Sequence, residues 1–580
     1  MVQYAEKLPI EKDPVHISSQ VEVPPNVSGL LGGNSFVKSD LQGILNGRIT
    51  DFLRKVNILR PALEERLHQG PIRLLRLSAS EDGIDVQLQS RTEIMEEVVA
   101  ELRSMPIIED PAVLKSTLTA LTRYAVLSHR WSSRIPELSF DDTKELCDKA
   151  SKKGFYAEDI MKEVRYRKVL QYCGKAIEYG CRYAWFDSGC INQRSSAELN
   201  ESIEAMFQWY RNAEVCIVHL GSTNDPSTME DDKWFRRGWT LQELLASQKM
   251  KFFNAQWHDI TPERYDIVRL RSAQDTVNGT AQPRERLFGQ LMPTISKAEL
   301  YKKVVCTTQI DSKSLDDFEP GLAQARSIIS WMVNRRTRRP EDRAYCLLGL
   351  LDLHLPIAYG EGFDRAFFRL QVEIMSKTDD RGFFLWAGQP STRNSMFARD
   401  PTSLAASPVK PSDRLVADIL YRSMTKDTDY IDQSLPLSNI GLRMQVTLCD
   451  IRCIDLRHAP DGLLMMEPVL PIGKVAARAS WNIWDARSQL DFEHFRVNAL
   501  DMKWDQDWRG EIETPHLKLG LLGSRRLSTG PRDSLWAVVL REDNSRIPRR
   551  YSRVAAINPF PVHWPEEGSP LALPERIYVV

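Results

Sequence analysis

The sequence predicts an α/β domain built on a parallel sheet, followed by a helical extension and a β-rich C-terminal domain. Three observations predict this fold class. Between about 124 and 255, short apolar runs alternate with amphipathic helical stretches, which is the pattern of βαβ crossovers. From about 261 to 390 the spacing of apolar residues is mainly helical. From about 391 onward, Pro and Ser become frequent and strand-like runs stand between turns.

The N-terminal region is expected to be an arm followed by a helix. Residues 1 to about 38 mix Pro, Gly, Ser and charges, a composition typical of a poorly ordered segment. Residues 40–68 have helical spacing that is interrupted at Pro61. A short strand candidate, PIRLLRL, follows at 71–77, and further helical spacing covers 91–122.

Four short apolar runs are expected to form the central strands of the parallel sheet. A helix ending at Gly180 separates the first two, and a helix over 195–213 separates the second from the third. Ser195 and Glu198 have the spacing of a capping box at the start of this second helix. The four runs are YAVLSH (124–129), RYAWFD (182–187), EVCIVHL (214–220) and KMKFFNA (249–255).

The chain is long enough for several domains, since 580 residues exceed what one compact core usually organises. We expect four segments with different roles in the fold. They are an N-terminal arm and helix (1–70), the α/β domain (71–260), the helical extension (261–390) and the β-rich C-terminal domain (391–580).

Composition excludes some function classes. The formal net charge of −1 gives no general attraction to nucleic acid or to an anionic membrane. No apolar run reaches the roughly 18 residues of a membrane-spanning helix, and the N-terminus lacks the apolar core of a signal peptide. We therefore expect a soluble, cytoplasmic protein with no nucleic-acid partner and no membrane span.

Nine scattered cysteines suit reduced thiols better than a disulfide framework. The closest pair, Cys449 and Cys453, has His458 nearby. Zinc sites usually need four well-spaced ligands, so no metal site and no bound cofactor are expected.

Ligands of parallel sheets bind outside the carboxyl ends of the strands. This rule nominates Ser128 to Trp131 after the first strand and Asp187 to Gln193 after the second. It also nominates the 221–238 loop after the third strand, which leads to WTLQELLAS and to Glu243.

Glu243 has two interpretations on spacing alone. Thr240 and Glu243 form the T-x-x-E pattern of a capping box, in which the carboxylate only stabilises the start of its helix. On a helical wheel, however, Glu243 and Trp239 lie one turn apart, opposite the apolar face. A carboxylate placed there is exposed to solvent or lines a cleft beside an aromatic ring.

The neighbouring candidates also have two interpretations each. Asp187 either caps the turn DSGC or faces the cleft. Arg130 either binds a phosphate or carboxylate, or pairs with an acid such as Asp187. Cys190 is a minor nucleophile candidate with His129 as its base, but GCIN shows no known hydrolase signature. The basic run at 334–343 is interpreted as the solvated end of a helix rather than a nuclear-import signal.

Several segments together resemble the fungal HET (heterokaryon incompatibility) domain. They are YAVLSHRW, YAWFDSGCINQRSSAELNESIEAMFQWYRNAEVCIVHL and WFRRGWTLQELLASQKMKFFNAQW, in the family's order and spacing. The segments RRPEDRAYCLLGLLDLHLPIAYGEGFDRAFFRLQVEIM and DDRGFFLWAG resemble the region that follows the domain in many vegetative incompatibility proteins. Ser132 departs from the family, which usually has Gly there. The resemblance implies a role in non-self recognition and programmed cell death, a form of innate immunity.

A more distant resemblance links the domain to TIR domains and hence to a flavodoxin-like sheet. AVLSHR, YAWFD and WTLQEL are similar to TIR segments, and in TIR enzymes that cleave NAD the glutamate of the last segment is catalytic. The resemblance implies that Glu243 is catalytic and that NAD is the substrate. We expect substrate-binding roles for Ser128, Arg130, Trp131, Asp187 and Trp239. The alternative is a non-enzymatic signalling module that acts by self-association or by binding a regulatory protein partner.

Overall fold

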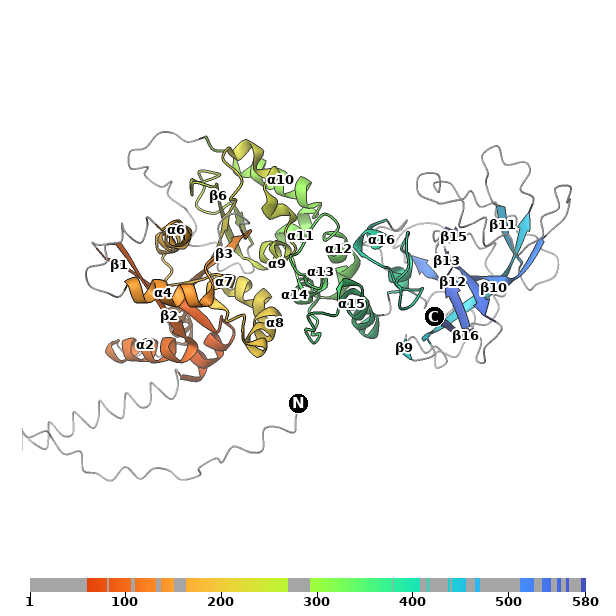
Figure 1. The fold of residues 1–580 in the computed structure, drawn as a ribbon, viewed down its shortest axis with the longest axis horizontal. Helices are drawn as coiled ribbons and strands as arrows, with labels where there is room; N and C mark the ends of the chain where they lie inside the picture. Colours follow the sequence, from red (N-terminus) through yellow and green to blue (C-terminus); the bar gives the residue numbers. More distant parts are fainter. Residues whose placement is uncertain are drawn as a thin grey trace, which may run out of the picture.

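The computed structural model describes residues 60–406 apart from gaps at 81–82, 106–109, 132–136, 151–162, 270–292 and 379, and beyond 406 it describes the strands alone. An α/β part, a helical part and a group of strands follow one another along the longest axis (Figure 1). The expected N-terminal arm and Ser132 lie outside the described residues.

The α/β part contains a seven-stranded sheet in the order β2-β1-β4-β3-β5-β6-β7. β3 is parallel to both β4 and β5, and β5 is parallel to β6. β1 is antiparallel to β2 and β4, and β7 is antiparallel to β6. The strands are β1 (Arg73–Ser80), β2 (Gly83–Ser90), β3 (Tyr124–His129), β4 (Tyr183–Trp185), β5 (Val215–His219), β6 (Lys249–Phe253) and β7 (Ile267–Val268).

The four expected central strands are therefore present and parallel, but a purely parallel sheet was too narrow a prediction. The sheet is mixed because the β1–β2 pair joins one edge and β7 joins the other. All six residues of β3 are buried, as expected for a parallel strand that is covered on both faces. The expected second strand ends at Trp185, so Asp187 opens the short helix α7 (Asp187–Cys190) instead.

Helices surround this sheet, and tyrosine side chains fix two of them to β3. Tyr172 donates to the carbonyl oxygen of Ala125 at 2.8 Å, and Tyr210 donates to that of Leu127 at 2.9 Å. At the start of α8, Ser195 accepts from the amide of Glu198, but the Glu198 carboxylate bonds to the amide of Asn192, so only half of the expected capping box forms. The helices are α2 (Arg91–Ser104), α3 (Pro111–Leu121), α4 (Phe140–Ala150), α6 (Val164–Glu178), α8 (Ser196–Asn212) and α9 (Trp239–Ala246).

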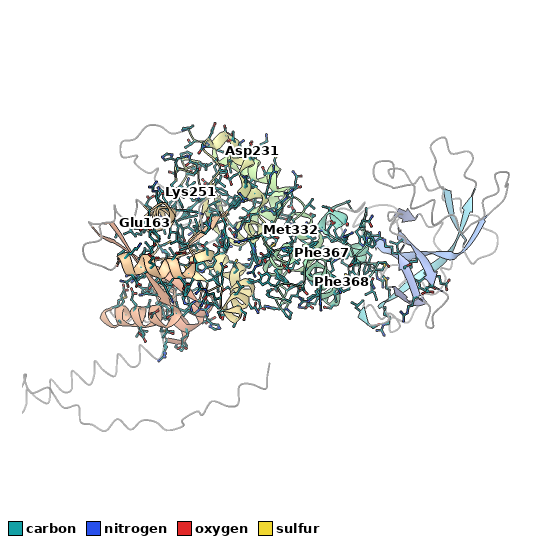
Figure 2. The ribbon with its side chains drawn as sticks, viewed as in Figure 1. Glu163, Asp231, Lys251, Met332, Phe367 and Phe368 are labelled. Carbon is teal, nitrogen blue, oxygen red and sulfur yellow. The ribbon has the colours of Figure 1, made fainter. Side chains whose placement is uncertain are left out.

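The helical extension packs directly on the α/β part. Helix α14 lies against α8 and α9 so closely that a Cβ on Gly349 would be 2.5 Å from Cβ of Phe207 and 2.7 Å from Oε1 of Gln242. Met332 and Phe367, labelled in Figure 2, are fully buried within this part. Its helices are α10 (Lys297–Thr308), α11 (Ser312–Asp316), α12 (Ala325–Ser330), α13 (Asp342–Tyr345), α14 (Leu348–Leu351), α15 (Phe363–Lys377) and α16 (Pro401–Ala405).

A backbone connection also joins the two parts. The amide of Gly238 donates to the carbonyl of Arg336 at 2.9 Å, and the amide of Arg336 donates to the carbonyl of Arg236 at 2.7 Å. The basic run at 334–343 therefore differs from the solvated helix end that its sequence predicts. Helix α12 already ends at Ser330, and Arg335 within the run is buried.

Beyond residue 406 the described strands form a second sheet, in the order β11-β10-β16-β14-β13-β12-β8. In addition, β9 pairs with β10, β15 pairs with β13, and β10 pairs with β12. Arg553 of β14 joins this sheet to the helical part, donating to the carbonyls of Phe384 and Trp386 at 2.7 and 2.6 Å. The strands are β8 (Leu415–Val416), β9 (Leu437–Ser438), β10 (Gly441–Ile454), β11 (Met465–Val469), β12 (Ile512–Arg525), β13 (Leu535–Asp543), β14 (Arg550–Arg553), β15 (Phe560–Val562) and β16 (Glu575–Val579). The division into a separate β-rich domain stays a prediction.

Within the described part of the chain, no helix is long and apolar enough to cross a membrane. The described residues also contain no group of three or more His, Cys, Asp or Glu side chains arranged to hold a metal. The side chains of Cys449 and Cys453, and all of His458, lie outside the described residues.

Candidate functional site

Glu243 lies at the carboxyl end of the parallel strands, where its helix meets β3. The hydroxyl of Ser128 donates a hydrogen bond to Oε2 of Glu243. The indole Nε1 of Trp234 donates in turn to the Ser128 oxygen at 2.8 Å. Glu243 is only 4% exposed and Ser128 is fully buried. The chain of hydrogen bonds from Trp234 through Ser128 to Glu243 is therefore shielded from solvent.

The surroundings of Glu243 change its affinity for a proton. Burial is the largest cause, and it raises the pKa of the carboxyl to about 7 because the charged form loses its hydration. The positive charge of Arg237, the hydrogen bond from Ser128 and the charge of Arg335 lower the pKa, while the charge of Asp187 raises it. A carboxyl group with such a pKa can hold or release a proton near neutral pH, which suits acid–base chemistry.

The capping interpretation of Glu243 is wrong. Helix α9 has Gly238 at its N-cap and no side-chain capping bond. The Thr240 hydroxyl lies at the carbonyls of Trp234 and Arg237, at 2.7 and 2.8 Å. Thr240 therefore anchors the segment before the helix, and the Glu243 carboxylate is left to interact with Ser128.

Asp187 forms a second cluster with Trp131 and Arg237. Its carboxylate accepts from Nε1 of Trp131 at 3.0 Å and from Nη2 of Arg237 at 3.1 Å. The guanidinium carbon of Arg237 lies 5.3 Å from the ring centroid of Trp131, within the range of a cation–π contact. Asp187 therefore pairs with Arg237, whereas Arg130 is exposed at the end of β3.

The two clusters are linked through Arg237. Its charge acts on the pKa of Glu243, as does that of Asp187. Of the residues nominated from the sequence, Ser128, Trp131, Asp187 and Glu243 thus lie in one region of mixed charge. The Glu243 carboxyl, which can be neutral near pH 7, therefore lies in the same region as the ion pair of Asp187 and Arg237.

Trp239 has a different partner from Glu243. It is half-buried, and its side chain hydrogen-bonds to the carboxyl of Asp342 in the helical extension. The hydroxyl of Tyr359 donates to the same carboxyl at 2.9 Å. The structure therefore uses Trp239 to join α9 to the extension, and it does not present the indole to a ligand beside Glu243.

Cys190 and His129 do not form a nucleophile and its base. Burial raises the pKa of the Cys190 thiol to about 12, whereas a nucleophilic cysteine needs a lowered pKa. The His129 ring lies 3.3 Å from the carboxylate of Glu137, which also binds the ammonium group of Lys168 at 2.9 Å. Burial lowers the pKa of His129, and the ring serves as a neutral core group.

Three further residues join the site: Trp234, Arg237 and Arg335. The first two lie in the 221–238 loop that the sequence nominated, but neither was given a role there. Trp234 and Arg237 stand shortly before Glu243 in the stretch WFRRGWTLQELLAS, so a search for polar groups near the carboxylate could have included them. Arg335 belongs to the distant basic run, and its Nη1 donates to Thr240 Oγ1 at 2.9 Å. No local sequence signal predicts that contact.

One protein-family profile matches a part of the chain that includes several of these residues. The profile of the family described as Heterokaryon incompatibility protein (HET) matches residues 124–231, which run from β3 to the segment after β5. This part of the chain is similar to the HET domain. The matched residues include Ser128, Trp131 and Asp187, and they end before Glu243.

A curated relative shares more of the chain than the HET profile does. Over 262 residues the chain is 33% identical to the Vegetative incompatibility protein HET-E-1 of Podospora anserina. The aligned region covers 43% of this chain and 16% of that protein, so the match spans a small part of the relative's length. No solved structure gives a significant match to the chain.

Proposed function

We propose that this HET-domain protein is a cytoplasmic effector of heterokaryon incompatibility that promotes cell death by cleaving NAD. Two comparisons support the biological role: the HET profile over 124–231 and the identity to a protein named for vegetative incompatibility. The single structural observation that supports the chemistry is the buried Glu243 carboxyl, hydrogen-bonded to Ser128 at the carboxyl ends of the parallel strands.

The chemistry needs a fixed carboxylate beside the ribose. Cleavage of the bond between nicotinamide and ribose develops positive charge on the sugar, and an oriented carboxylate stabilises that charge. The Ser128 hydroxyl would hold the Glu243 carboxylate in one orientation. Arg237 and the exposed Arg130 supply positive charge for the pyrophosphate, and guanidinium groups suit such oxyanions.

Glu243 and Ser128 are buried, so the reaction requires the site to open first. Because Glu243 is 4% exposed and Ser128 is fully buried, NAD reaches the carboxyl only after the surrounding side chains separate. We propose that self-association or a regulatory protein supplies that change. In this proposal, the buried arrangement of Glu243 and Ser128 belongs to the resting state.

The same burial favours a second function from another class. The Glu243 carboxyl accepts from the Ser128 hydroxyl, whose oxygen accepts from Trp234. In this second function, these hydrogen bonds have a purely structural role and hold α9 on the sheet. The HET domain would then act as a non-enzymatic signalling module, by self-association or by binding a partner.

The deciding experiment follows nicotinamide release from NAD by chromatography, over a range of concentrations of the full chain. We expect wild type to release nicotinamide at high protein concentration and Glu243→Gln to lose at least about 100-fold, the size typical of removing a group that stabilises transition-state charge. Glu204→Gln on the exposed face of α8 is the matched control and keeps the activity.

Two results would reject NAD cleavage by Glu243. One is a folded Glu243→Gln variant that still releases nicotinamide at the wild-type rate. The other is a wild type that releases none at any concentration yet kills the cells that express it, with Glu243→Gln equally lethal. That second result would support the signalling module.

A further inference from the structure

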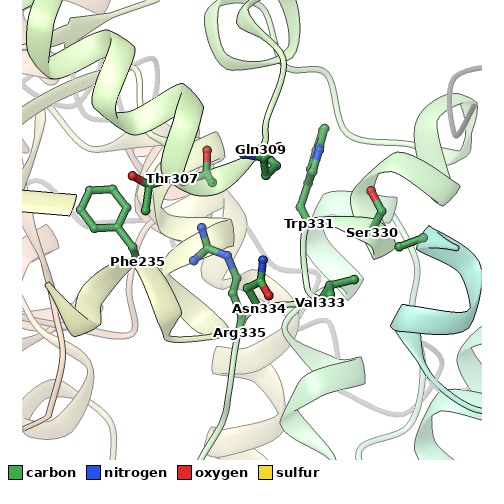
Figure 3. A pocket seen from close by; sticks show the side chains of 10 residues that line it. Phe235, Thr307, Gln309, Ser330, Trp331, Val333, Asn334 and Arg335 are labelled. Atoms are coloured by element: carbon green, nitrogen blue, oxygen red, sulfur yellow. The ribbon is translucent and has the colours of Figure 1, made fainter. Parts of the chain in front are cut away.

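A pocket of about 250 Å³ lies where the helical extension meets the segment before α9 (Figure 3). The end of α10 contributes Thr307 and Gln309, and the turn after α12 contributes Trp331 and Asn334. Phe235 closes the side that belongs to the α/β part. Gln309 and Asn334 are exposed, whereas Phe235 and Trp331 are buried, so the pocket has a polar rim and an apolar interior.

Arg335 is the charged residue among those that line this pocket. Its side chain is 2% exposed, and Figure 3 shows the guanidinium group extending into the space between Phe235, Thr307 and Asn334. Nη1 donates to the carbonyl of Arg237 and to Thr240 Oγ1, both at 2.9 Å. Nη2 has no hydrogen-bond partner among the described residues.

A buried guanidinium without an acidic partner is costly, because the charge loses its hydration and no opposite charge compensates it. Burial lowers the pKa of Arg335 to about 10, so the group still carries its charge near neutral pH. No ion pair to Arg335 occurs within the described part of the chain. An anion that enters the pocket would meet both the free Nη2 donor and the unpaired charge.

We propose that this pocket binds a small organic anion whose carboxylate or phosphate group meets Arg335. Guanidinium groups recognise both kinds of oxyanion through paired N–H donors. The apolar part of the ligand packs against Phe235 and Trp331, and the polar rim at Gln309 and Asn334 remains open to solvent. The volume of the pocket limits the ligand to the size of a small metabolite.

Arg335 also connects the pocket to Glu243. Through Nη1 it holds the segment that precedes α9, and its charge is among those that lower the pKa of Glu243. An anion that compensates this charge would therefore strengthen the hold of Glu243 on its proton. This regulatory consequence rests on the proposed function, but binding in the pocket does not.

Calorimetric titration of the full chain with three probes tests binding without any activity assay. The probes are benzoate, benzamide as its neutral counterpart of similar shape, and inorganic phosphate. We expect benzoate to bind at least about tenfold more tightly than benzamide, the factor that corresponds to about 1.4 kcal/mol. Equal binding of benzoate and benzamide, or no binding of benzoate, would overturn the proposal. Binding of phosphate without binding of benzoate counts as the same negative result, because it would show a site for an inorganic anion only.

Variants then locate the binding. Arg335→Met should abolish benzoate binding, but it also removes two donors that support the fold. Ala405→Trp is the second variant, because Ala405 is exposed at the pocket and a large ring there fills the space. Arg338→Met, an exposed neighbour outside the pocket, is the control and keeps wild-type binding. Unchanged benzoate binding to a folded Ala405→Trp variant would show that the anion binds elsewhere.

Discussion

The Ser128 hydroxyl donates to the Glu243 carboxylate across 115 positions of sequence, from the end of β3 to the middle of α9. Trp234 donates to the same hydroxyl oxygen at 2.8 Å, which leaves the hydroxyl proton for Glu243. The sheet therefore fixes the orientation of the carboxyl through one oxygen atom. This relationship has measurable consequences for stability.

The first prediction concerns pH. Burial raises the pKa of Glu243 from 4.5 to about 7 in the folded chain, so between these values the folded state binds more protons than the unfolded state. Wild-type stability relative to Glu243→Gln should then be highest below about pH 4.5 and fall as the pH rises to 7. The shift corresponds to about 3 kcal/mol. Urea unfolding of both proteins at pH 5 and pH 8 measures the difference.

A difference between the two proteins that stays constant with pH would show that Glu243 has an ordinary pKa. Ser128→Ala provides a further check. It removes the hydrogen bond that lowers the pKa, so the carboxyl of that variant should bind its proton still more tightly.

The second prediction concerns the pair of Asp187 and Arg237. Both side chains are largely buried, at 19% and 16% exposure, and Trp131 adds a hydrogen bond and a ring contact. A double-mutant cycle with Asp187→Asn and Arg237→Met should give a coupling energy of about 1 kcal/mol or more.

The matched control for this cycle is the pair of Arg194 and Asp141. Their side chains are 85% and 55% exposed at a distance of 2.9 Å, and exposed pairs are typically worth between about 0 and 1 kcal/mol. Equal coupling in the two pairs would mean that Asp187 and Arg237 gain nothing from their surroundings.

The third prediction concerns Gly349. Its Cβ in an alanine variant would collide with Phe207 and Gln242, and overpacking of this kind costs roughly 1–3 kcal/mol. Gly174→Ala in α6 is the control, since its Cβ would meet only Ile84 Cδ1 at 3.4 Å. Gly174→Ala should be neutral or stabilise the chain by up to about 1 kcal/mol. Thermal unfolding compares the two, and equal melting temperatures would contradict the close approach of α14.

The fourth prediction concerns thiol chemistry. Cys306 is exposed, whereas Cys190 is buried with a raised pKa. Iodoacetamide should therefore label Cys306 in the native protein and leave Cys190 unlabelled until denaturant is added, as peptide mass spectrometry would show. Rapid native labelling of Cys190 would revive it as a nucleophile.

The central strands could be predicted because burial leaves a local trace in the sequence. β3 is buried at every position, and the apolar residues 124–127 at its start mark it in the sequence. β2 was not predicted, although Ile84, Val86 and Leu88 alternate with polar residues as in a half-buried strand. Its antiparallel pairing with β1 is one of three that make the sheet mixed, together with β1–β4 and β6–β7.

The site was only partly predictable, because contacts between residues far apart in the sequence leave no local pattern. The rule on strand ends brought Ser128, Asp187 and Glu243 to one edge, and the structure places them there. One interpretation of Arg130 paired it with an acid such as Asp187, yet Arg237 takes that position. The contact of Arg335 with Thr240 depends on how the extension folds back, which no local pattern records.

The backbone hydrogen bonds that Arg336 forms with Gly238 and Arg236 make the start of α9 depend on the helical extension. They bear on how long a segment must be to keep α9 in its native surroundings. The family profile ends at 231 and the sequence boundary was placed at 260, but the amide of Gly238 finds its acceptor only at Arg336. A gene fusion or recombination event that carried residues 71–260 alone would produce α9 without its contacts to Arg336 and α14. A segment that keeps Glu243 in these surroundings therefore extends through α14.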